Sequence, residues 1–290
     1  MHQNSNETLA EVLKRASVFL EQKGHDASMA RTYWLLAFDW TLTDLVRQLN
    51  NVISDDQKAA YSQVLERVVK QEPIQYIVGY ADFMGERYTV TPHTLIPRED
   101  TAGLVERALI HLKNYPTPRI LDIGTGSGII AITLAKKMPH AQVTAVDISS
   151  EALEIARQNA DAHQVAVEWI QSDVCKQLPA AQRFDIIISN PPYISQDEVS
   201  LMDASVLQYE PHLALFAEQN GLAIYKQIAL ESQHVIQLDG AIFLEIGFRQ
   251  AEAVCAIFRE VYPHASIRVE QDLNDLDRYV IIDLKGERHE

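Results

Sequence analysis

The 290-residue sequence predicts an α/β fold: a seven-stranded, mostly parallel, doubly wound sheet, preceded by a small helical bundle. Helical periodicity runs through the first 72 residues, whereas from Arg119 onward continuous apolar strands alternate with helical patterns. Such strands are typical of a parallel sheet that is covered on both faces. We therefore expect a helical domain over 1–72, a β-hairpin linker over 73–96 and a sheet-containing domain over 97–290.

The N-terminal helices are predicted from apolar faces and capping residues. Asp26 is expected to cap a second helix, and Ser54 has capping-box spacing with Gln57 before a further one, which ends by Pro73. From residue 74 to residue 95 the period changes, and short strands forming a hairpin are expected. The face of the first helix comprises Leu9, Val12, Leu13, Ala16 and Leu20.

The strands of the sheet are predicted from short apolar runs separated by helical patterns. The last two runs lie close together in the sequence, which favours an antiparallel pair at the edge of the sheet. The predicted strands are residues 120–123, 143–146, 165–170, 186–189, 242–246, 267–270 and 279–284.

The composition disfavours a protein that binds nucleic acid, a membrane or a metal ion. The formal net charge of -15 and the pI near 5.1 disfavour non-specific association with nucleic acid or an anionic membrane. Two isolated cysteines, Cys175 and Cys255, are expected to be buried apolar residues, and the scattered histidines suggest no metal site. A polar N-terminus without a signal-peptide pattern, and no apolar run of roughly 18–20 residues, lead us to expect a cytoplasmic protein.

A glycine loop follows the first predicted strand. Residues 121–128 read Leu-Asp-Ile-Gly-Thr-Gly-Ser-Gly, and an apolar helix comes next. Glycines allow a tight turn and let a ligand approach without a Cβ in the way. In an open parallel sheet this turn lies at the carboxyl edge, where ligands bind. The candidate cofactor-binding residues here are Gly124, Thr125, Gly126, Ser127 and Gly128.

The glycine spacing indicates which cofactor binds. A dinucleotide fingerprint is G-x-G-x-x-G, whereas Ile129 takes the place of its third glycine here. Asp122 would repel a pyrophosphate but could hold the cationic amino-acid end of S-adenosylmethionine, directly or through water. Asp147, at the end of the second strand, could accept hydrogen bonds from both ribose hydroxyls. Asp173, which follows the third strand, could accept a hydrogen bond from the adenine amine. Two alternatives remain for the loop: it could bind a dinucleotide, or it could be a turn with only a structural role. The alternative for Asp173 is that it is a solvated strand end or a helix cap.

The most specific stretch is Asn190-Pro191-Pro192-Tyr193, which follows the fourth strand. Each proline fixes φ, removes a backbone donor and makes the preceding residue extended. We expect a rigid corner at the carboxyl edge, beside the glycine loop, with bare carbonyls and the Asn190 side chain facing the cofactor. A plain proline turn is the alternative.

This corner suits a planar –NH₂ group whose lone pair is delocalised. The Asn190 side-chain oxygen and the Pro191 carbonyl can accept its two N–H groups and fix the nitrogen in line with a methyl group. Tyr193 can stack on the amide plane. A sulfonium methyl is already activated, so neither a metal nor a strong general base is needed. Both a glutamine amide and the exocyclic amine of adenine fit this description.

With both motifs in place, the chain resembles the HemK/PrmC family of protein-(glutamine-N5) methyltransferases, which act on peptide chain release factors. The resemblance covers nearly all of the chain and includes the layout of helical domain, β-linker and class I S-adenosylmethionine-dependent methyltransferase domain. Further local matches are residues 73–79, 95–98, 209–215 and 244–247.

The resemblance implies the reaction and the roles of the matching residues. The substrate would be the glutamine of the Gly-Gly-Gln loop in class 1 release factors, and the product N5-methylglutamine. The glycine loop would hold the methionine end of the cofactor and Asp147 its ribose. Asn190 would contact both cofactor and substrate, and Asn190, Pro191, Pro192 and Tyr193 would hold the glutamine amide as the catalytic and substrate-binding residues.

The chain departs from the family pattern at two positions. Ala102 replaces an acid, which puts in doubt a cofactor contact from that helix start, and Val174 replaces an aromatic beside the adenine site. Arg98 is expected to be a structural ion-pair partner. Three alternatives remain open: an N6-adenine nucleic-acid methyltransferase, a glutamine methyltransferase acting on a ribosomal protein, and a non-catalytic binding module. The acidic composition argues against the first.

Overall fold

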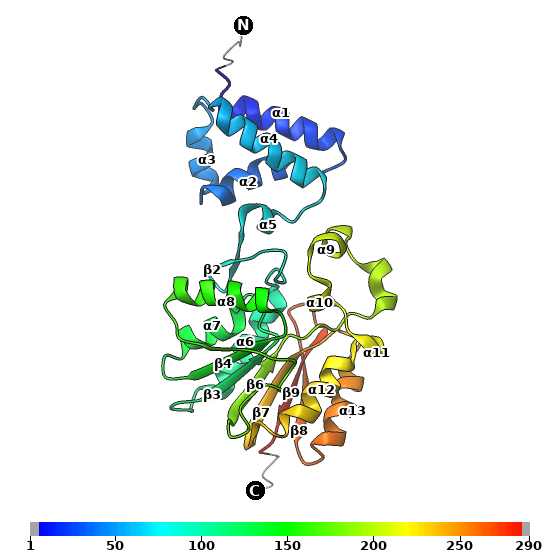
Figure 1. Cartoon of the computed structure of the whole chain (residues 1–290). Helices are drawn as coiled ribbons and strands as arrows, with labels where there is room; N and C mark the ends of the chain where they lie inside the picture. Colours follow the sequence, from blue (N-terminus) through cyan, green and yellow to red (C-terminus); the bar gives the residue numbers. More distant parts are fainter. Residues whose placement is uncertain (1–5, 286–290) are drawn as a thin grey trace. The chain divides into compact units, whose positions relative to one another are not determined.

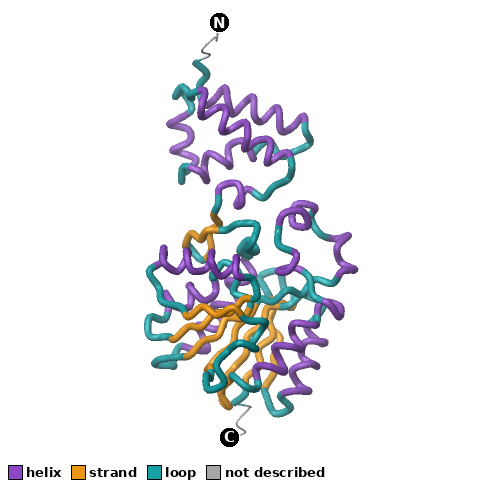
Figure 2. Tube along the Cα trace, viewed as in Figure 1, coloured by secondary structure: helices purple, strands orange, loops and turns teal. Residues whose placement is uncertain are grey.

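The computed structural model describes residues 6–285. Within this range the chain divides into two compact units: residues up to Gly79 together with Ala204–Tyr209 form the first, and the remaining residues form the second. The first unit is helical, and the second combines helices with strands (Figure 1, Figure 2).

Capping residues define where the helices of the first unit begin. The predicted capping box of Ser54 and Gln57 is confirmed, and Thr8 forms another with Glu11. Each box satisfies backbone N–H groups that have no partner within the helix. The helices of this unit are α1 (Leu9–Gln22), α2 (Met29–Ala37), α3 (Leu42–Gln48), α4 (Asp55–Val69), α5 (Ile74–Val78) and α9 (Ala204–Tyr209).

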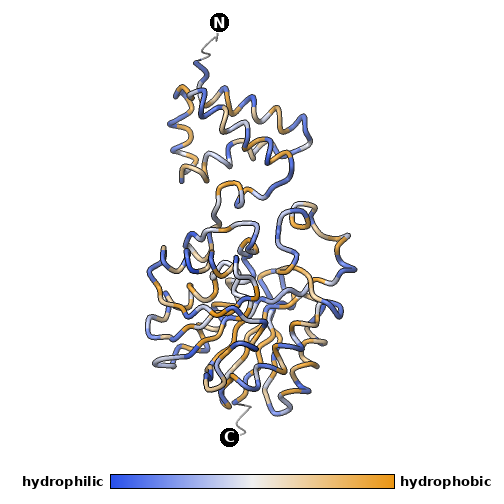
Figure 3. The backbone as a smooth tube through the Cα atoms, in the orientation of Figure 1, coloured by the Kyte–Doolittle hydropathy of each residue, from blue (hydrophilic) through white to orange (hydrophobic). Residues whose placement is uncertain are grey.

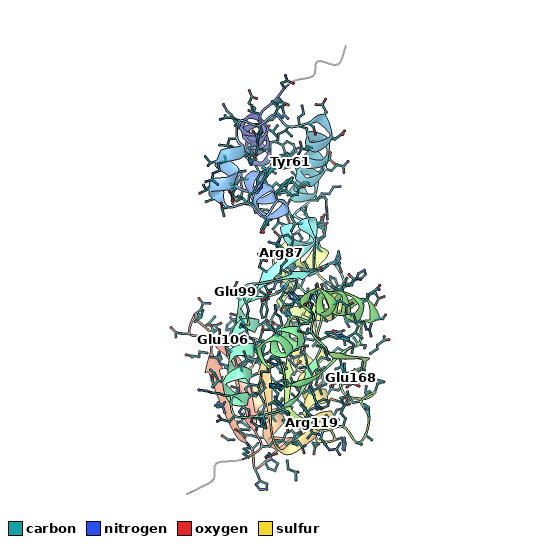
Figure 4. All side chains as sticks on the ribbon, turned by 90° about the vertical axis from the view of Figure 1, so that its left-hand side faces the viewer. Tyr61, Arg87, Glu99, Glu106, Arg119 and Glu168 are labelled. Atoms are coloured by element: carbon teal, nitrogen blue, oxygen red, sulfur yellow. The ribbon has the colours of Figure 1, made fainter. Side chains whose placement is uncertain are left out.

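The apolar faces of α1, α2, α3 and α4 meet in one core. Tyr61 of α4, labelled in Figure 4, lies in this core, and its hydroxyl donates to the Ala30 carbonyl at 2.6 Å. This bond satisfies a buried polar group and ties α4 to α2. Four of the five residues of the predicted face of α1 are buried, and Leu13 is partly buried against this core; the four are Leu9, Val12, Ala16 and Leu20.

Two local predictions in this unit are wrong. Helix α2 begins at Met29, and the Asp26 carboxylate accepts the backbone N–H and hydroxyl of Ser28, so it caps the turn before the helix. Residues 74–78 form the short helix α5, where the change of period suggested a strand. Gly79, with φ +84°, ends that helix in the left-handed conformation that glycine adopts without strain.

The second unit begins with the hairpin and continues into alternating strands and helices. The antiparallel hairpin consists of β1 (Tyr80–Phe83) and β2 (Glu86–Thr89). The strands that follow are β3 (Arg119–Ile123), β4 (Gln142–Asp147), β5 (Glu168–Gln171), β6 (Phe184–Ser189), β7 (Ile236–Glu245), β8 (Ser266–Gln271) and β9 (Asp277–Asp283). The helices are α6 (Glu99–Leu112), α7 (Ile129–Lys137), α8 (Ser150–His163), η1 (Gln196–Leu201), α10 (His212–Leu215), α11 (Glu218–Gly221), α12 (Ala223–Ser232) and α13 (Ala251–Val261).

Seven strands of the described residues form one sheet in the order β5-β4-β3-β6-β7-β9-β8. Strands β5, β4, β3, β6 and β7 are parallel, and β9 is antiparallel to both β7 and β8. The predicted fold class is therefore confirmed, including the antiparallel pair at the edge. The order reverses next to β3, and such a reversal places a ligand site at the carboxyl edge.

Helices cover both faces of this sheet (Figure 1). One face packs against α6 and α7, and the other packs against α12 and α13. Consecutive residues of a strand serve opposite faces: Ile186 and Ile188 of β6 belong to the first core, and Ile187 to the second. This explains why the central strands are continuously hydrophobic (Figure 3). Both cysteines are buried, as predicted.

The parallel strands bring their ends to common edges. Arg119 and Glu168, labelled in Figure 4, are the first residues of β3 and β5 and mark the amino edge. At the carboxyl edge, β3 leads into the glycine loop, β4 ends at Asp147 and β6 leads into the proline corner. The predicted ligand-binding segments are therefore neighbours in space. No helix in the described part of the chain is long and apolar enough to cross a membrane.

Candidate active site

A cavity of about 250 Å³ lies at the carboxyl edge of the sheet. Its walls come from the glycine loop, the ends of β4 and β5, the proline corner, the segment before α6 and the segment around α10. Most of the predicted site residues line it, namely Gly124, Thr125, Gly126, Ser127, Asp147, Asp173, Asn190, Pro191 and Pro192.

The glycine loop leaves room for a ligand at its first two glycines. Gly124 and Gly126 have φ values of +71° and +56°, and a Cβ built on either would meet no atom within 4 Å. Gly128 lies outside the lining, and a Cβ there would come within 2.9 Å of Ile132 and 3.1 Å of Trp169. The first two glycines therefore shape the cavity, whereas the third allows α7 to pack closely.

Asp122 lies behind the loop and is fully buried. One carboxylate oxygen accepts the Thr125 hydroxyl at 2.6 Å, and the residue does not line the cavity. Of the two routes that the sequence suggested, direct contact with a ligand in the cavity does not fit this position, and contact through water stays a prediction. Burial raises the pKa of Asp122 to about 7, against the lowering effect of the Thr125 hydrogen bond. Asp122 instead holds the loop through Thr125.

Asp147 links the glycine loop to the end of β4. Its two carboxylate oxygens accept the backbone N–H groups of Gly126 at 2.8 Å and Ser149 at 2.9 Å. Burial raises its pKa, and these N–H groups act in the opposite direction. Each oxygen has further lone pairs, so the carboxylate retains the capacity to accept two hydroxyl groups.

The wall after β5 combines Asp173 with apolar surface. The Asp173 carboxylate accepts hydrogen bonds from Lys176 and, at 2.9 Å, from Gln227, and the Lys176 hydrogen bond is the main cause of its lowered pKa. Val174 is buried with φ +51° and lines the cavity together with Ile148. A flat aromatic base would find apolar side chains and an acceptor at this wall.

The proline corner presents Asn190 at the opposite wall. The Ser189 hydroxyl donates to the Ile123 carbonyl at 2.7 Å, which joins the end of β6 to the end of β3. Asn190, Pro191 and Pro192 then line the cavity. Proline has no backbone N–H, so this wall offers acceptors from its main chain.

Like Gly128, the predicted site residue Tyr193 does not line this cavity. Together with Ile194 and Arg278 it lines a second cavity of about 210 Å³, and burial raises its pKa to about 12. Its main-chain carbonyl accepts a hydrogen bond from the Gln250 side chain at 2.9 Å. The structure thus places the main chain of Tyr193 at the end of the corner and its ring outside the lining.

Sequence reasoning missed two residues behind the corner. The Asn190 side-chain Nδ2 donates to the Thr101 hydroxyl at 3.0 Å, and that hydroxyl donates to Glu245 at 2.8 Å. Thr101 is next to Ala102, the departure that puts in doubt a cofactor contact from this helix start. Glu245 lies within the matching segment 244–247, but no local pattern indicates that it reaches Thr101.

Arg98 forms an ion pair with Glu210, as the sequence predicted for a structural role of Arg98. Its guanidinium contacts the buried Glu210 carboxylate at 2.6 Å, and Glu210 also accepts the Ile96 N–H at 3.3 Å. Arg98 and Pro211 both line the cavity. The pair therefore joins two walls that are more than one hundred residues apart in sequence.

Two family models match the chain. The model for a methyltransferase small domain matches residues 105–234, and the model for the PrmC N-terminal domain matches residues 11–79. A release factor glutamine methyltransferase of Enterococcus faecalis is 40% identical over 272 residues, 93% of this chain and 97% of the relative. The chain belongs to this family. A second member, from Lactococcus lactis, is 45% identical over 230 residues, 79% of this chain and 84% of the relative.

Solved structures support the fold. A methyltransferase of Pyrococcus furiosus is similar with a TM-score of 0.51 at 19% identity, covering 78% of this chain and 99% of that one. The catalytic domain of hMettl16 is similar with a TM-score of 0.55 at 13% identity, covering 87% and 91%. The family assignment and the sheet together make this chain a class I methyltransferase, as the sequence predicted.

Proposed function

We propose that the protein transfers a methyl group from S-adenosylmethionine to the side-chain amide nitrogen, N5, of the glutamine in the Gly-Gly-Gln loop of class 1 peptide chain release factors. The relatives from E. faecalis and L. lactis carry the name of this activity. The observation that carries the proposal is the juxtaposition, in one cavity, of the open glycine loop, Asp147 and Asn190.

The cavity residues fit S-adenosylmethionine. The loop at Gly124 and Gly126 offers room and backbone groups for the methionine end, and Asp147 offers acceptors for the ribose hydroxyls. Asp173 and the apolar Val174 are suited to the adenine amine and ring. The cofactor supplies a methyl group that its sulfonium already activates.

The proline corner binds the amide to be methylated. An amide nitrogen is a poor nucleophile because its lone pair is delocalised, and it needs orientation more than deprotonation. The Asn190 side-chain oxygen and the Pro191 carbonyl accept its two N–H groups. Fixed acceptors remove rotational freedom and favour positive charge as it develops on the nitrogen.

Tyr193 is the last residue of the proline corner, and its main chain contributes to the shape of the corner. The Gln250 hydrogen bond to its carbonyl keeps the main chain of the corner in place. The cavity that its ring lines is suited to the neighbouring part of the substrate loop, where the ring can pack on a peptide plane.

The N-terminal helices are proposed as the part that recognises the protein substrate. In this division residues 1–72 grip the release factor, 73–96 form the linker and 97–290 carry out catalysis. Release factors act on ribosomes, so we propose that the protein works in the cytoplasm, on protein and without direct contact to nucleic acid.

Mass spectrometry of a release factor incubated with the protein and S-adenosylmethionine tests the function. We expect the mass increment of one methyl group on the glutamine of the Gly-Gly-Gln loop, and none after that glutamine is replaced. Methylation that survives the replacement, or that appears instead on a ribosomal protein or on added DNA or RNA, would contradict the assignment.

Asn190→Ala tests the mechanism. Loss of one preorganised polar group should lower kcat by on the order of 10²-fold or more, while the melting temperature stays close to that of the wild type. Ser195→Ala, five residues downstream in the same segment, is the control that should leave kcat unchanged. A wild-type rate for Asn190→Ala would contradict the mechanism.

A further inference from the structure

A chain of hydrogen bonds leads from the cavity wall into the protein interior. It starts at Asn190 Nδ2, passes through the Thr101 hydroxyl at 3.0 Å and ends at Glu245 Oε2 at 2.8 Å. The three residues come from the corner, the first turn of α6 and the end of β7. Thr101 and Glu245 are only 2% and 1% exposed, so water cannot replace either partner without a rearrangement.

The chemistry of the middle residue gives this chain a direction. A hydroxyl has one proton to donate, and the Thr101 proton is used by Glu245. Towards Asn190, the Thr101 oxygen can therefore act only as an acceptor. An asparagine amide has a donor side and an acceptor side, so its NH₂ must face Thr101 and its Oδ1 remains for the cavity.

We propose that Thr101 and Glu245 are positioning residues that hold the Asn190 amide with its oxygen toward the substrate, and that they thereby select a glutamine amide over a glutamate carboxylate. This inference rests on the proposed function. The chain of hydrogen bonds from Asn190 through Thr101 to Glu245 is called the relay below. Without the relay, the Asn190 amide could rotate by half a turn and present its NH₂ to the substrate instead. A wall that donates suits a carboxylate, whereas a wall that accepts suits –NH₂, and an unpaired polar group in a closed site is strongly rejected.

Glu245 must be ionised for the relay to have its direction. Burial raises the pKa of Glu245 to about 7, and the Thr101 hydrogen bond acts against this rise. A protonated Glu245 could donate to Thr101, which would then be free to donate to Asn190 and reverse the amide. The charged or titratable groups that face Glu245 are Arg278 and Tyr279 of β9, Asp100 and Arg98 at the start of α6, Tyr193 of the corner and Tyr225 of α12.

Three variants test the relay in the full-length protein with a release factor as substrate. Thr101→Val removes the hydroxyl at similar volume and should lower kcat by about 10-fold, the effect of one lost hydrogen bond, with little change in the KM for S-adenosylmethionine. Thr101→Ser retains the hydroxyl and should restore most of the rate. We expect kcat of the wild type to decline as the pH falls through about 7, and Glu245→Gln to remove this decline.

A matched control separates positioning from packing. Thr133 is also a buried threonine of this unit, and its hydroxyl lies 2.9 Å from the Tyr88 hydroxyl, outside the cavity lining. Thr133→Val should therefore lower the melting temperature as Thr101→Val does, but leave kcat unchanged. Equal kcat values for Thr101→Val and the wild type, or an equal loss in both valine variants, would overturn the proposal.

A second readout does not depend on turnover. In protein that carries isotope-labelled asparagine, the Asn190 side-chain NH₂ signals are assigned by their loss in Asn190→Asp. We expect Thr101→Val to shift these signals and Thr133→Val to leave them in place. Unchanged signals in Thr101→Val would overturn the relay even if the enzyme is active. If instead the signals shift and no release factor is methylated, the proposed function fails and the relay stands.

Discussion

Gly221 gives the sharpest structural test of how the proline corner is held. It ends α11 with φ +79°, and a Cβ at this position would lie against the Tyr193 carbonyl, 2.8 Å from its carbon and 2.5 Å from Gln250 Nε2. Gln250 is the side chain that donates to the same carbonyl. Gly221→Ala should therefore displace the end of the corner as well as strain its own backbone.

The magnitude follows from two separable costs. A residue with a Cβ in the left-handed conformation costs roughly 1–2 kcal/mol, and forcing an extra methyl group into packed surroundings costs about 1–3 kcal/mol. Gly85 has a similar φ of +81°, but a Cβ there would meet no atom within 4 Å. Gly85→Ala should therefore show the first cost alone, and Gly221→Ala roughly 2–5 kcal/mol in total.

Two measurements on both variants separate these costs. Urea denaturation gives the free energy of unfolding, and methyl transfer to a release factor gives kcat. We expect Gly85→Ala to retain the wild-type kcat, and Gly221→Ala to lose both stability and kcat because the corner moves. If Gly221→Ala were no less stable than Gly85→Ala and as active as the wild type, the corner would not depend on this contact.

Three further predictions concern the cofactor site, the loop and the helical unit. Asp147→Asn should weaken S-adenosylmethionine binding, measured by calorimetry, by about 10-fold or more, which is the scale for a lost charge-assisted hydrogen bond. The control Asp275→Asn, on an exposed loop, should bind the cofactor as the wild type does. Equal affinities of Asp147→Asn and the wild type would contradict the ribose assignment. Burial raises the pKa of Asp122 from 3.8 to about 7, so its protonation stabilises the fold below pH 3.8 and that contribution is lost as the pH rises through about 7. The contribution of Asp122 to the free energy of unfolding should fall by roughly 4 kcal/mol over this window. Urea titrations at several pH values should therefore show a smaller loss of stability with rising pH in Asp122→Asn than in the wild type, and an equal loss in both would contradict this prediction. Deleting residues 1–72 should raise the KM for the release factor more than it lowers kcat, and unchanged kinetics would remove the role of that unit.

Local sequence patterns predicted the parts of the site that depend on turns. The glycine loop and the proline corner are short segments whose residues determine their own backbone, and the alternation of strands and helices places both at one edge. For the same reason the sheet and its antiparallel edge pair could be predicted. The sequence does not indicate the helix at residues 74–78, because five residues are too few to show a helical period.

The hydrogen bonds behind the proline corner could not be predicted from the sequence. Thr101 and Glu245 are 144 residues apart, and their hydrogen bond depends on how α6 packs on the sheet beside β7. The direction of the Tyr193 ring likewise depends on its surroundings, since the corner fixes the main chain but not the side chain. Such contacts follow from the packing of distant elements, which no spacing along the chain records.

The central claim is that the proline corner aims a flat amide at the methyl donor. A crystal structure with S-adenosylhomocysteine and a Gly-Gly-Gln peptide tests it most directly. We predict that the two N–H groups of the glutamine amide lie within hydrogen-bond distance of Asn190 Oδ1 and the Pro191 carbonyl, with the nitrogen facing the sulfur. A structure in which Asn190 turns its NH₂ to the peptide, or in which another group lies nearest the sulfur, would contradict the account.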